Sequence, residues 1–237
     1  PRSVRFFERK LYMDERFLRT EMLLGPEAME KLAAAHVAVF GLGGVGSWCA
    51  EALARSGVGA LTLVDHDDVG LTNLNRQAEA LESTLGQPKA AAMAERISQI
   101  NPACRLTVLA EKYEADSREK FFAVPYDYIV DCIDLVSCKL DLIETALARG
   151  IPILSSLGTG NKLDPSLFRI SDLSKTEGCP LARVVRKELR ARGIVHHRVL
   201  WSPEEPRAPI QTEAPPPPPP GRPPPRGGGP PAGRPRG

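Results

Sequence analysis

Four glycines lie at the spacing of a nucleotide-binding turn. Gly41, Gly43, Gly44 and Gly46 form the run GLGGVG directly after the apolar segment HVAVF. Glycine permits the tight turn, lets backbone N–H groups approach a phosphate and lets the following helix pack on its strand. Asp65 lies 19 residues past Gly46, where a carboxylate can bind ribose hydroxyls. The pattern predicts a nucleotide site and leaves NAD, FAD and ATP as candidates.

Three charged stretches decide between these nucleotides. They supply Asp67, Asn73 and Arg76 (in 65–77, DHDDVGLTNLNRQ), Lys89 (in 86–89, GQPK) and Asp134 (in 131–134, DCID). Hydride transfer needs no second set of cations and acids. Cleavage of ATP does need them, because Arg and Lys hold the triphosphate and a carboxylate holds Mg²⁺. The sequence therefore favours ATP chemistry.

Apolar segments alternate with helical patterns along most of the chain. We expect strands at 36–40, 60–65, 105–109, 126–131 and 151–156, with a further one at 167–171. We expect helices at 3–25, 26–34, 47–56, 88–100, 117–122, 140–149 and 181–192. Strands that alternate with helices predict an α/β fold, with a Rossmann-like, mostly parallel sheet and helices on both faces.

Composition divides the sequence into three expected parts. Of the 23 prolines, 15 lie in the last 35 residues, which have too little apolar content to fold. We expect an N-terminal helical arm at 1–35, an ATP-binding Rossmann-like catalytic domain at 36–202 and a disordered Pro/Gly/Arg-rich tail at 203–237. Residues 1–202 carry 26 basic and 26 acidic side chains, so the formal charge of +2 lies in the tail. This balance excludes a globally basic nucleic-acid binder and leaves room for a local basic patch.

The remaining chemistry-bearing residues predict no metal centre of cysteine and histidine. The five cysteines form no C-x-x-C pair, which argues against a zinc ribbon and favours free thiols. We interpret Cys179 as a buried or incidental thiol, and His196 and His197 as part of a basic edge beside Arg198. No apolar run reaches the roughly 18 residues that a membrane span requires. We expect a cytoplasmic protein without a membrane span.

Several runs resemble the superfamily of ubiquitin-activating-type adenylyltransferases, which includes the sulphur-carrier-activating enzymes of molybdopterin and thiamine synthesis. These runs are VAVFGLGGVGSW (37–48), LVDHDDVGLTNLNRQ (63–77), LGQPK (85–89) and DCID (131–134). Other runs resemble one family within it, the tRNA threonylcarbamoyladenosine dehydratases: RTEMLLG (19–25), LGTGNKLDP (157–165) and DLSKTEGCPLARVVRKELRARGI (172–194). The resemblance covers about 16–205.

The resemblance implies an ATP-dependent dehydration that cyclises threonylcarbamoyladenosine in tRNA. The side-chain carboxylate would attack the α-phosphorus of ATP, giving an acyl-adenylate and pyrophosphate. The neighbouring carbamoyl group would then attack the activated carbonyl and release AMP. Adenylation gives a poor electrophile a good leaving group, and ring closure gains from being intramolecular. ATP and Mg²⁺ are the implied cofactors, and tRNA bearing the linear modification is the implied partner.

The resemblance also implies roles for residues in the matched motifs. Gly41, Gly43, Gly44 and Gly46 would form the nucleotide turn, Asp65 would hold the ribose, and Asn73, Arg76 and Lys89 would hold the triphosphate. Asp134 would hold Mg²⁺, and Asp67 is a secondary candidate near the phosphates. Arg19 aligns with an arginine that reaches the phosphates of the neighbouring subunit, which implies a homodimer. The implied catalytic set is Arg19, Arg76, Lys89 and Asp134.

A local basic helix offers a surface for tRNA. Its cations are Arg183, Arg186, Lys187 and Arg190, and such a patch can contact phosphates without a net basic charge. A plain solvated helix face is the alternative interpretation.

Three other functions stay open on the sequence. The chain could adenylate the C-terminus of a ubiquitin-like sulphur carrier, and a sulphur-transfer protein is then a candidate partner. An NAD-dependent oxidoreductase explains the glycine run and Asp65 but neither NLNRQ nor LGQPK. A non-enzymatic scaffold that kept the fold is the third. The resemblance fades at 201–206, where prolines replace the family's apolar closing segment, so we expect a truncated or frame-shifted C-terminus.

Overall fold

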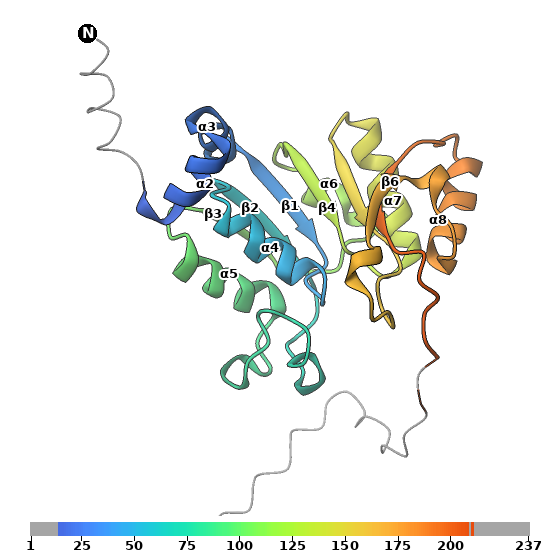
Figure 1. The fold of residues 1–237 in the computed structure, drawn as a ribbon, viewed down its shortest axis with the longest axis horizontal. Helices are drawn as coiled ribbons and strands as arrows, with labels where there is room; N and C mark the ends of the chain where they lie inside the picture. Colours follow the sequence, from blue (N-terminus) through green and yellow to red (C-terminus); the bar gives the residue numbers. More distant parts are fainter. Residues whose placement is uncertain (1–13, 209, 211–237) are drawn as a thin grey trace, which may run out of the picture. The chain divides into compact units, whose positions relative to one another are not determined.

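The computed structural model describes residues 14–208 and 210 (Figure 1). The chain divides into two compact units, Pro1–Pro206 and Arg207–Gly237, and the fold described below belongs to the first. The part of the expected helical arm before residue 14 lies outside the described residues. So does most of the expected tail, from residue 211 onward. The three-part division of the chain therefore stays a prediction.

The first unit is built on one mixed sheet. Its strands are β1 (His36–Phe40), β2 (Ala60–Val64), β3 (Arg105–Leu109), β4 (Tyr128–Asp131), β5 (Ile153–Ser156), β6 (Arg169–Asp172) and β7 (Arg198–Trp201). Their order is β3-β2-β1-β4-β5-β7-β6, and each neighbouring pair is parallel except β6 with β7. The expected α/β fold with a mostly parallel sheet is confirmed.

The first strand shows why both faces of the sheet are covered. Val37 and Val39 of β1 belong to one apolar cluster, whereas Ala38 and Phe40 belong to the other. Successive strand residues point to opposite faces, so β1 has apolar side chains on both sides. The first cluster is completed by α4 (Gly46–Arg55) and α5 (Lys89–Ile100). The second is completed by α6 (Arg118–Phe121), α7 (Val136–Ala148) and α8 (Pro180–Ala191).

Two short helices precede the sheet. They are α2 (Leu18–Leu24) and α3 (Pro26–Ala34), after a 3₁₀ turn at Glu15–Phe17. Gly25 separates them with φ of +83°, a conformation that favours glycine, and Pro26 opens α3 at its first position. These helices lie at the start of β1 (Figure 1).

Several of the expected bounds differ from those of the observed elements. The strand expected at 126–131 starts at Tyr128, and the helix expected at 140–149 starts earlier, at Val136. β7 was missed, because four residues with a single alternation give too short a pattern to recognise. Within the described residues, none of the helices is both long enough and apolar enough to cross a bilayer.

Candidate nucleotide-binding site

A cavity of about 610 Å³ opens at the carboxyl ends of the strands. The strand order changes direction between β1 and β4, and open α/β sheets bind ligands outside such a switch point. Nine of the residues expected to bind nucleotide or metal line this cavity: Gly41, Gly43, Gly44, Asp65, Asp67, Asn73, Arg76, Lys89 and Asp134. The fold thus brings together residues that are spread over more than 90 positions of the sequence.

The four glycines of the turn have different local roles. Gly41 has φ of +86°, and a Cβ on it would lie 2.7 Å from the carbonyl oxygen of Cys132. A Cβ on Gly46 would lie 1.7 Å from the carbonyl oxygen of Gly41. These two glycines allow the turn to pack closely. A Cβ on Gly43 would meet nothing nearer than 4.0 Å, so this backbone stays open to the cavity. Gly46 is buried and does not line the cavity.

Asp65 fixes the glycine turn to the end of β2. Its Oδ2 accepts a hydrogen bond from the Leu42 N–H at 2.6 Å, and its Oδ1 accepts one from the Asp67 N–H at 2.9 Å. Each carboxylate oxygen keeps a further lone pair, because a carboxylate offers about four acceptor positions. Asp65 is therefore oriented by the backbone and can still accept ribose hydroxyls.

Two of the expected triphosphate ligands are cations. The Lys89 Nζ lies 2.9 Å from the Asp67 Oδ2, and its side chain is only 7% exposed whereas that of Asp67 is 54% exposed. The Arg76 guanidinium donates to the Thr72 carbonyl oxygen at 2.8 Å and to the Asn75 Oδ1 at 3.0 Å. Both cations thus lie beside the cavity, and an incoming phosphate can replace the partners that they have in this structure.

Asn73 differs from these two cations in its bonding. Its Oδ1 accepts a hydrogen bond from the Gly70 N–H at 2.8 Å, which orients the side chain amide. The amide nitrogen carries two donors, so the oriented side chain can still donate to a phosphate oxygen at the cavity.

The carboxylates of the cavity suit a hard divalent cation. Asp134 follows β4 and is exposed at the cavity wall. Asp65, His66 and Asp67 also offer ligand atoms that lie within 4.8 Å of one another. Mg²⁺ prefers a few carboxylates together with water and substrate phosphates. The carboxylates of Asp134 and Asp67, which both line the cavity, are therefore a donor set that fits Mg²⁺.

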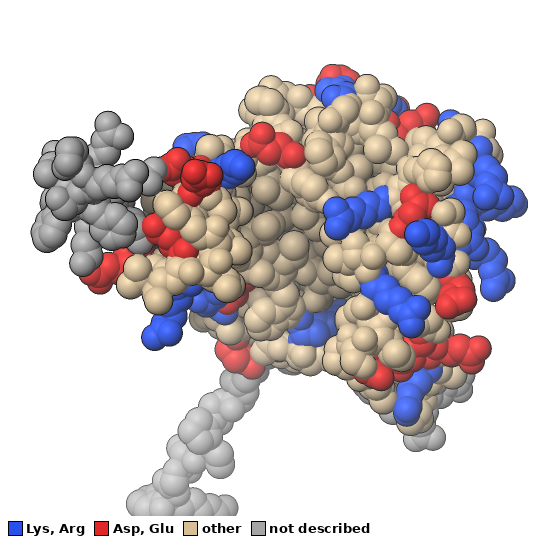
Figure 2. Space-filling view, turned by 45° about the horizontal axis from the view of Figure 1, so that its top comes forward, with Lys and Arg blue, Asp and Glu red and all other residues tan. Residues whose placement is uncertain are grey.

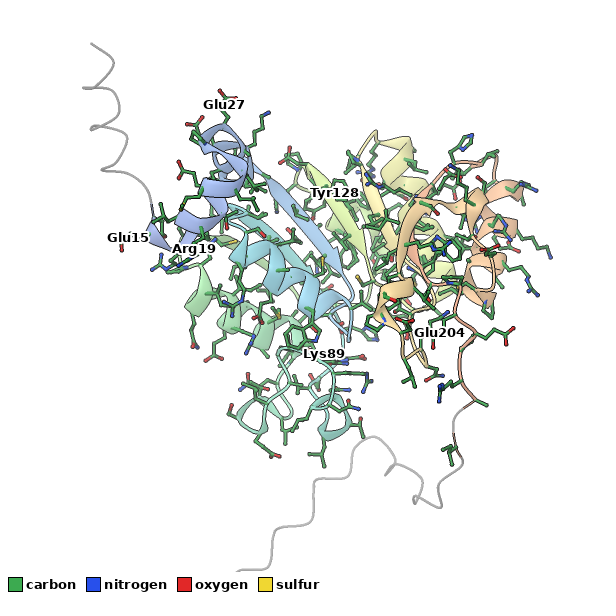
Figure 3. The ribbon with its side chains drawn as sticks, viewed as in Figure 1. Glu15, Arg19, Glu27, Lys89, Tyr128 and Glu204 are labelled. Carbon is green, nitrogen blue, oxygen red and sulfur yellow. The ribbon has the colours of Figure 1, made fainter. Side chains whose placement is uncertain are left out.

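Arg19 and the basic helix lie apart from the cavity. Arg19 is an exposed residue of α2 and does not line the cavity, and Figure 3 draws it well away from Lys89. Arg183, Lys187 and Arg190 are exposed on α8, and Figure 2 shows Lys and Arg side chains gathered on this side of the molecule. Arg186 is half-buried instead, and its Nη1 donates to the Thr176 carbonyl oxygen at 2.7 Å.

The interpretation of His197 as part of a basic edge is wrong. The side chain is buried, and its Nε2 lies 2.8 Å from the Ser155 Oγ. Burial lowers the pKa of His197 to about 4, so the ring is neutral at pH 7. His197 directly precedes β7, a strand that pairs with β5 and that the sequence pattern had not indicated. His196 is exposed, as expected, and Cys179 is buried, as expected.

Other residues of the site carried no motif signal. Glu111, Lys112 and Tyr113 line the cavity after the end of β3, and their place after a strand was the only available clue. Glu79 is buried, and neither of its carboxyl oxygens meets a partner at normal hydrogen-bond geometry within 14–208. Burial raises the pKa of Glu79 to about 7, although the charge of Lys89 opposes part of this rise.

Comparison with known proteins agrees with this geometry. Residues 17–197 match the ThiF family. A tRNA threonylcarbamoyladenosine dehydratase of Bacillus subtilis (strain 168) is 48% identical over 195 residues, which are 82% of this chain and 77% of the relative. A molybdopterin-synthase adenylyltransferase of Salmonella typhimurium (strain LT2) is 35% identical over 54% of this chain and 51% of the relative.

Solved structures point the same way. The Escherichia coli tRNA N6-threonylcarbamoyladenosine dehydratase TcdA in complex with ATP is 42% identical, with a TM-score of 0.77 over 81% of this chain and 82% of that one. The likeness to the dehydratases is closer and longer than the likeness to the molybdopterin enzyme. The chain therefore belongs to the ThiF family, and within it its sequence and fold place it among the tRNA threonylcarbamoyladenosine dehydratases.

Proposed function

We propose that this chain catalyses the ATP-dependent dehydration of threonylcarbamoyladenosine in tRNA through an acyl-adenylate. One observation carries the proposal. A single cavity combines an open glycine turn, the cations Arg76 and Lys89 and separate carboxylates, which is the set that ATP cleavage requires. The substrate is inferred from the similarity to dehydratases, including one whose structure holds ATP.

The reaction has two displacements. The carboxylate of the threonylcarbamoyl group attacks the α-phosphorus of ATP, and pyrophosphate leaves. The neighbouring carbamoyl group then attacks the activated carbonyl and releases a proton, the ring closes and AMP leaves with one carboxylate oxygen. The net change in the nucleoside is the loss of one water.

The proposal gives each residue of the cavity a part in positioning and charge neutralisation. The backbone at Gly43 and Gly44 faces the phosphates, and Asp65 accepts ribose hydroxyls. Asn73, Arg76 and Lys89 hold the triphosphate, and Lys89 changes its partner from Asp67 to a phosphate oxygen. Asp134 holds Mg²⁺, with Asp67 as a second candidate. When bound, this ion neutralises charge that develops on the phosphate oxygens.

Two further parts of the proposal concern partners. Arg19 is exposed and distant from the cavity of its own chain, which is compatible with action on the phosphates of a second subunit in a homodimer. The exposed cations Arg183, Lys187 and Arg190 supply a surface for tRNA phosphates, whereas Arg186 is engaged within the protein. Because ATP and tRNA occur together in the cytoplasm, the proposal locates the reaction there. A sulphur-transfer partner stays a prediction.

A nucleoside mass measurement tests the proposal. The chain is incubated with ATP, Mg²⁺ and tRNA that bears the linear modification, and the digested nucleosides are weighed. We expect a product lighter by one water, formed together with AMP and pyrophosphate. ATP turnover that requires a carrier protein's C-terminus would favour adenylation of a sulphur carrier instead. Binding of NAD without binding of ATP would overturn the proposal. Lys89→Ala serves as the inactive control.

A further inference from the structure

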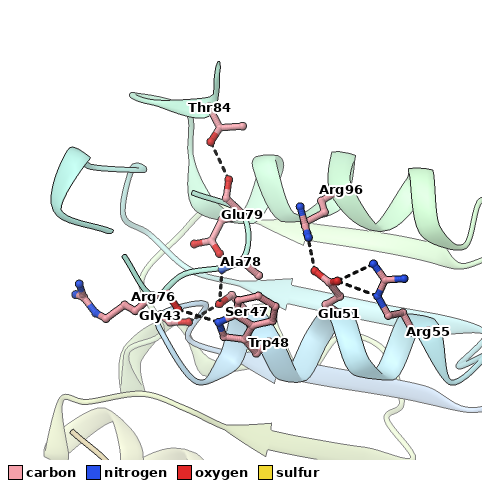
Figure 4. A network of polar contacts seen from close by, with 10 residues as sticks. All are labelled: Gly43, Ser47, Trp48, Glu51, Arg55, Arg76, Ala78, Glu79, Thr84 and Arg96. Carbon is pink, nitrogen blue, oxygen red and sulfur yellow. Dashed lines mark hydrogen bonds and ion pairs between the residues drawn. The ribbon is translucent and has the colours of Figure 1, made fainter. Parts of the chain in front are cut away.

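The first turn of α4 is bonded to two parts of the nucleotide site at once. Ser47 is completely buried, and its Oγ donates to the Gly43 carbonyl oxygen at 2.7 Å. The same Oγ accepts a hydrogen bond from the Ala78 N–H at 3.1 Å. One hydroxyl therefore connects the glycine turn to the segment that follows Arg76 (Figure 4).

Trp48 makes the second connection. Its ring is 53% exposed, so it contributes little to the core. Its Nε1 nevertheless donates to the carbonyl oxygen of Arg76 at 2.9 Å (Figure 4). An exposed tryptophan that gives its one side-chain donor to the backbone of a site residue fixes that backbone rather than filling space.

The Arg76 side chain also crosses the glycine turn. A Cβ built on Gly44 would lie 3.4 Å from both Cγ and Cδ of Arg76. The stem of the arginine therefore runs directly over Gly44. At the far end of the segment, the Thr84 Oγ1 donates to the Glu79 carbonyl oxygen at 2.7 Å. The segment is therefore bonded to α4 at Arg76 and Ala78, and its far end at Glu79 is bonded to Thr84.

We propose that Ser47 and Trp48 are positioning residues that set the guanidinium of Arg76 relative to the backbone of the glycine turn. Ser47 holds the turn and the Arg76 segment together, and Trp48 fixes the Arg76 carbonyl. Both act through Arg76 and neither touches the reacting atoms. The inference rests on the proposed function, since it needs Arg76 to bind phosphate.

A purely structural role predicts a different outcome. If the two bonds only stabilise the fold, their loss lowers the free energy of unfolding and leaves the nucleotide affinity of the folded fraction unchanged. If they position Arg76, their loss weakens ATP binding and adenylation, and the effect requires the Arg76 side chain. A double-mutant cycle separates these cases, because residues that act through one another are not additive.

Trp48→Phe is the sharpest variant, because it keeps an aromatic side chain and removes the N–H donor. We expect this variant to lose about threefold to tenfold in the rate of AMP formation in single turnover, which matches the loss of one hydrogen bond. In the Arg76→Ala background the same change has less than about a twofold effect. We expect Ser47→Ala to lower the rate of AMP formation in the same way, and to have a similarly small effect in the Arg76→Ala background. Trp201→Phe is the matched control, since its buried Nε1 donates to the Ser171 Oγ at 2.9 Å on the opposite edge of the sheet.

Fluorescence supplies a measurement that does not depend on tRNA. The chain has two tryptophans, so Trp201→Phe leaves Trp48 as the source of the tryptophan emission. We expect ATP to change this emission, and Arg76→Ala to reduce the change. The inference would be overturned if Trp48→Phe lowered the rate of AMP formation equally with and without the Arg76 side chain. It would also be overturned if Trp48→Phe left this rate unchanged in both backgrounds. Arg76-dependent emission without any dehydrated nucleoside would instead overturn the proposed tRNA reaction and leave the positioning role standing.

Discussion

Two lysine–aspartate pairs lie near the carboxyl ends of the strands, and they differ in their exposure to solvent. Lys89 and Asp67 are 2.9 Å apart, and the aspartate is half exposed at the cavity. Lys139 and Asp131 are 2.7 Å apart, and neither side chain has any exposed surface. The chemical groups are the same, so the surroundings decide what each pair can do.

The sealed pair fixes structure. The second oxygen of Asp131 accepts a hydrogen bond from the Ile133 N–H at 3.0 Å, and Lys139 also donates to the Ser156 carbonyl oxygen at 3.0 Å. Both charges are thereby compensated inside the protein. The pair joins β4, α7 and β5 beneath the segment that carries Asp134. The open pair makes fewer bonds and can exchange one partner for a ligand. Identical charges are therefore enclosed within the fold in one place and left accessible to a ligand in the other.

The largest expected effect is on the sealed pair. Lys139→Met removes one charge and leaves the Asp131 carboxylate buried without a compensating charge, which costs about 3–5 kcal/mol of unfolding free energy. Lys89→Met, the matched change in the open pair, leaves Asp67 in contact with water and costs less than about 1 kcal/mol. Urea denaturation of both variants measures the difference. Equal losses would show that the two pairs do not differ in the way described.

A smaller effect concerns Glu79, a buried carboxyl without the partner that Asp131 has. Its pKa rises from 4.5 to about 7 on folding. The charged form is therefore disfavoured in the folded state, and stability is lost as the pH rises from 4.5 through 7. Glu79→Gln removes this cost, so above pH 7 the variant is more stable by up to roughly 3 kcal/mol, and the advantage vanishes at pH 4.5.

The acid side of the same pH series provides an internal control. Burial depresses the pKa of His197 to about 4, so its contribution to stability is present above 6.5 and lost as the pH falls toward 4. This loss occurs in both the parent and Glu79→Gln. Denaturation midpoints measured between pH 4 and 8 report both the loss of stability from Glu79 at rising pH and the loss from His197 at falling pH. A Glu79→Gln variant whose advantage did not grow with pH would contradict the assignment.

The smallest effect belongs to a pair that is open on both sides. Arg192 and Glu144 are 2.8 Å apart, with side chains 37% and 46% exposed. Glu144→Gln changes the unfolding free energy by less than about 1 kcal/mol, and added salt reduces the change further. Thermal melts at low and high salt check this. A loss as large as that of Lys139→Met would mean that burial does not control the strength of these pairs.

Local patterns predicted much of the fold and the site. Apolar alternation and the glycine run predicted β1, β2, β3 and the mostly parallel sheet. The motifs around Asp65, Arg76, Lys89 and Asp134 predicted residues that the fold then gathers around one cavity. These features are local, because turn geometry and strand ends depend on a few neighbouring residues. β7 and the burial of His197 were not predicted, since they depend on which distant strand accepts the segment.

By itself, the sequence determined which residue types could bind a nucleotide and at which strand ends they would lie. Only the tertiary structure decided which charges are sealed and which are open. Nothing in the residues around Lys139 and Lys89 indicates that one pair has no exposed surface and the other faces a cavity. Solvent access depends on the packing of distant elements, and it is solvent access that sets the energy of a charge. For the same reason, the bonds from Ser47 and Trp48 to the Arg76 segment became visible only in three dimensions.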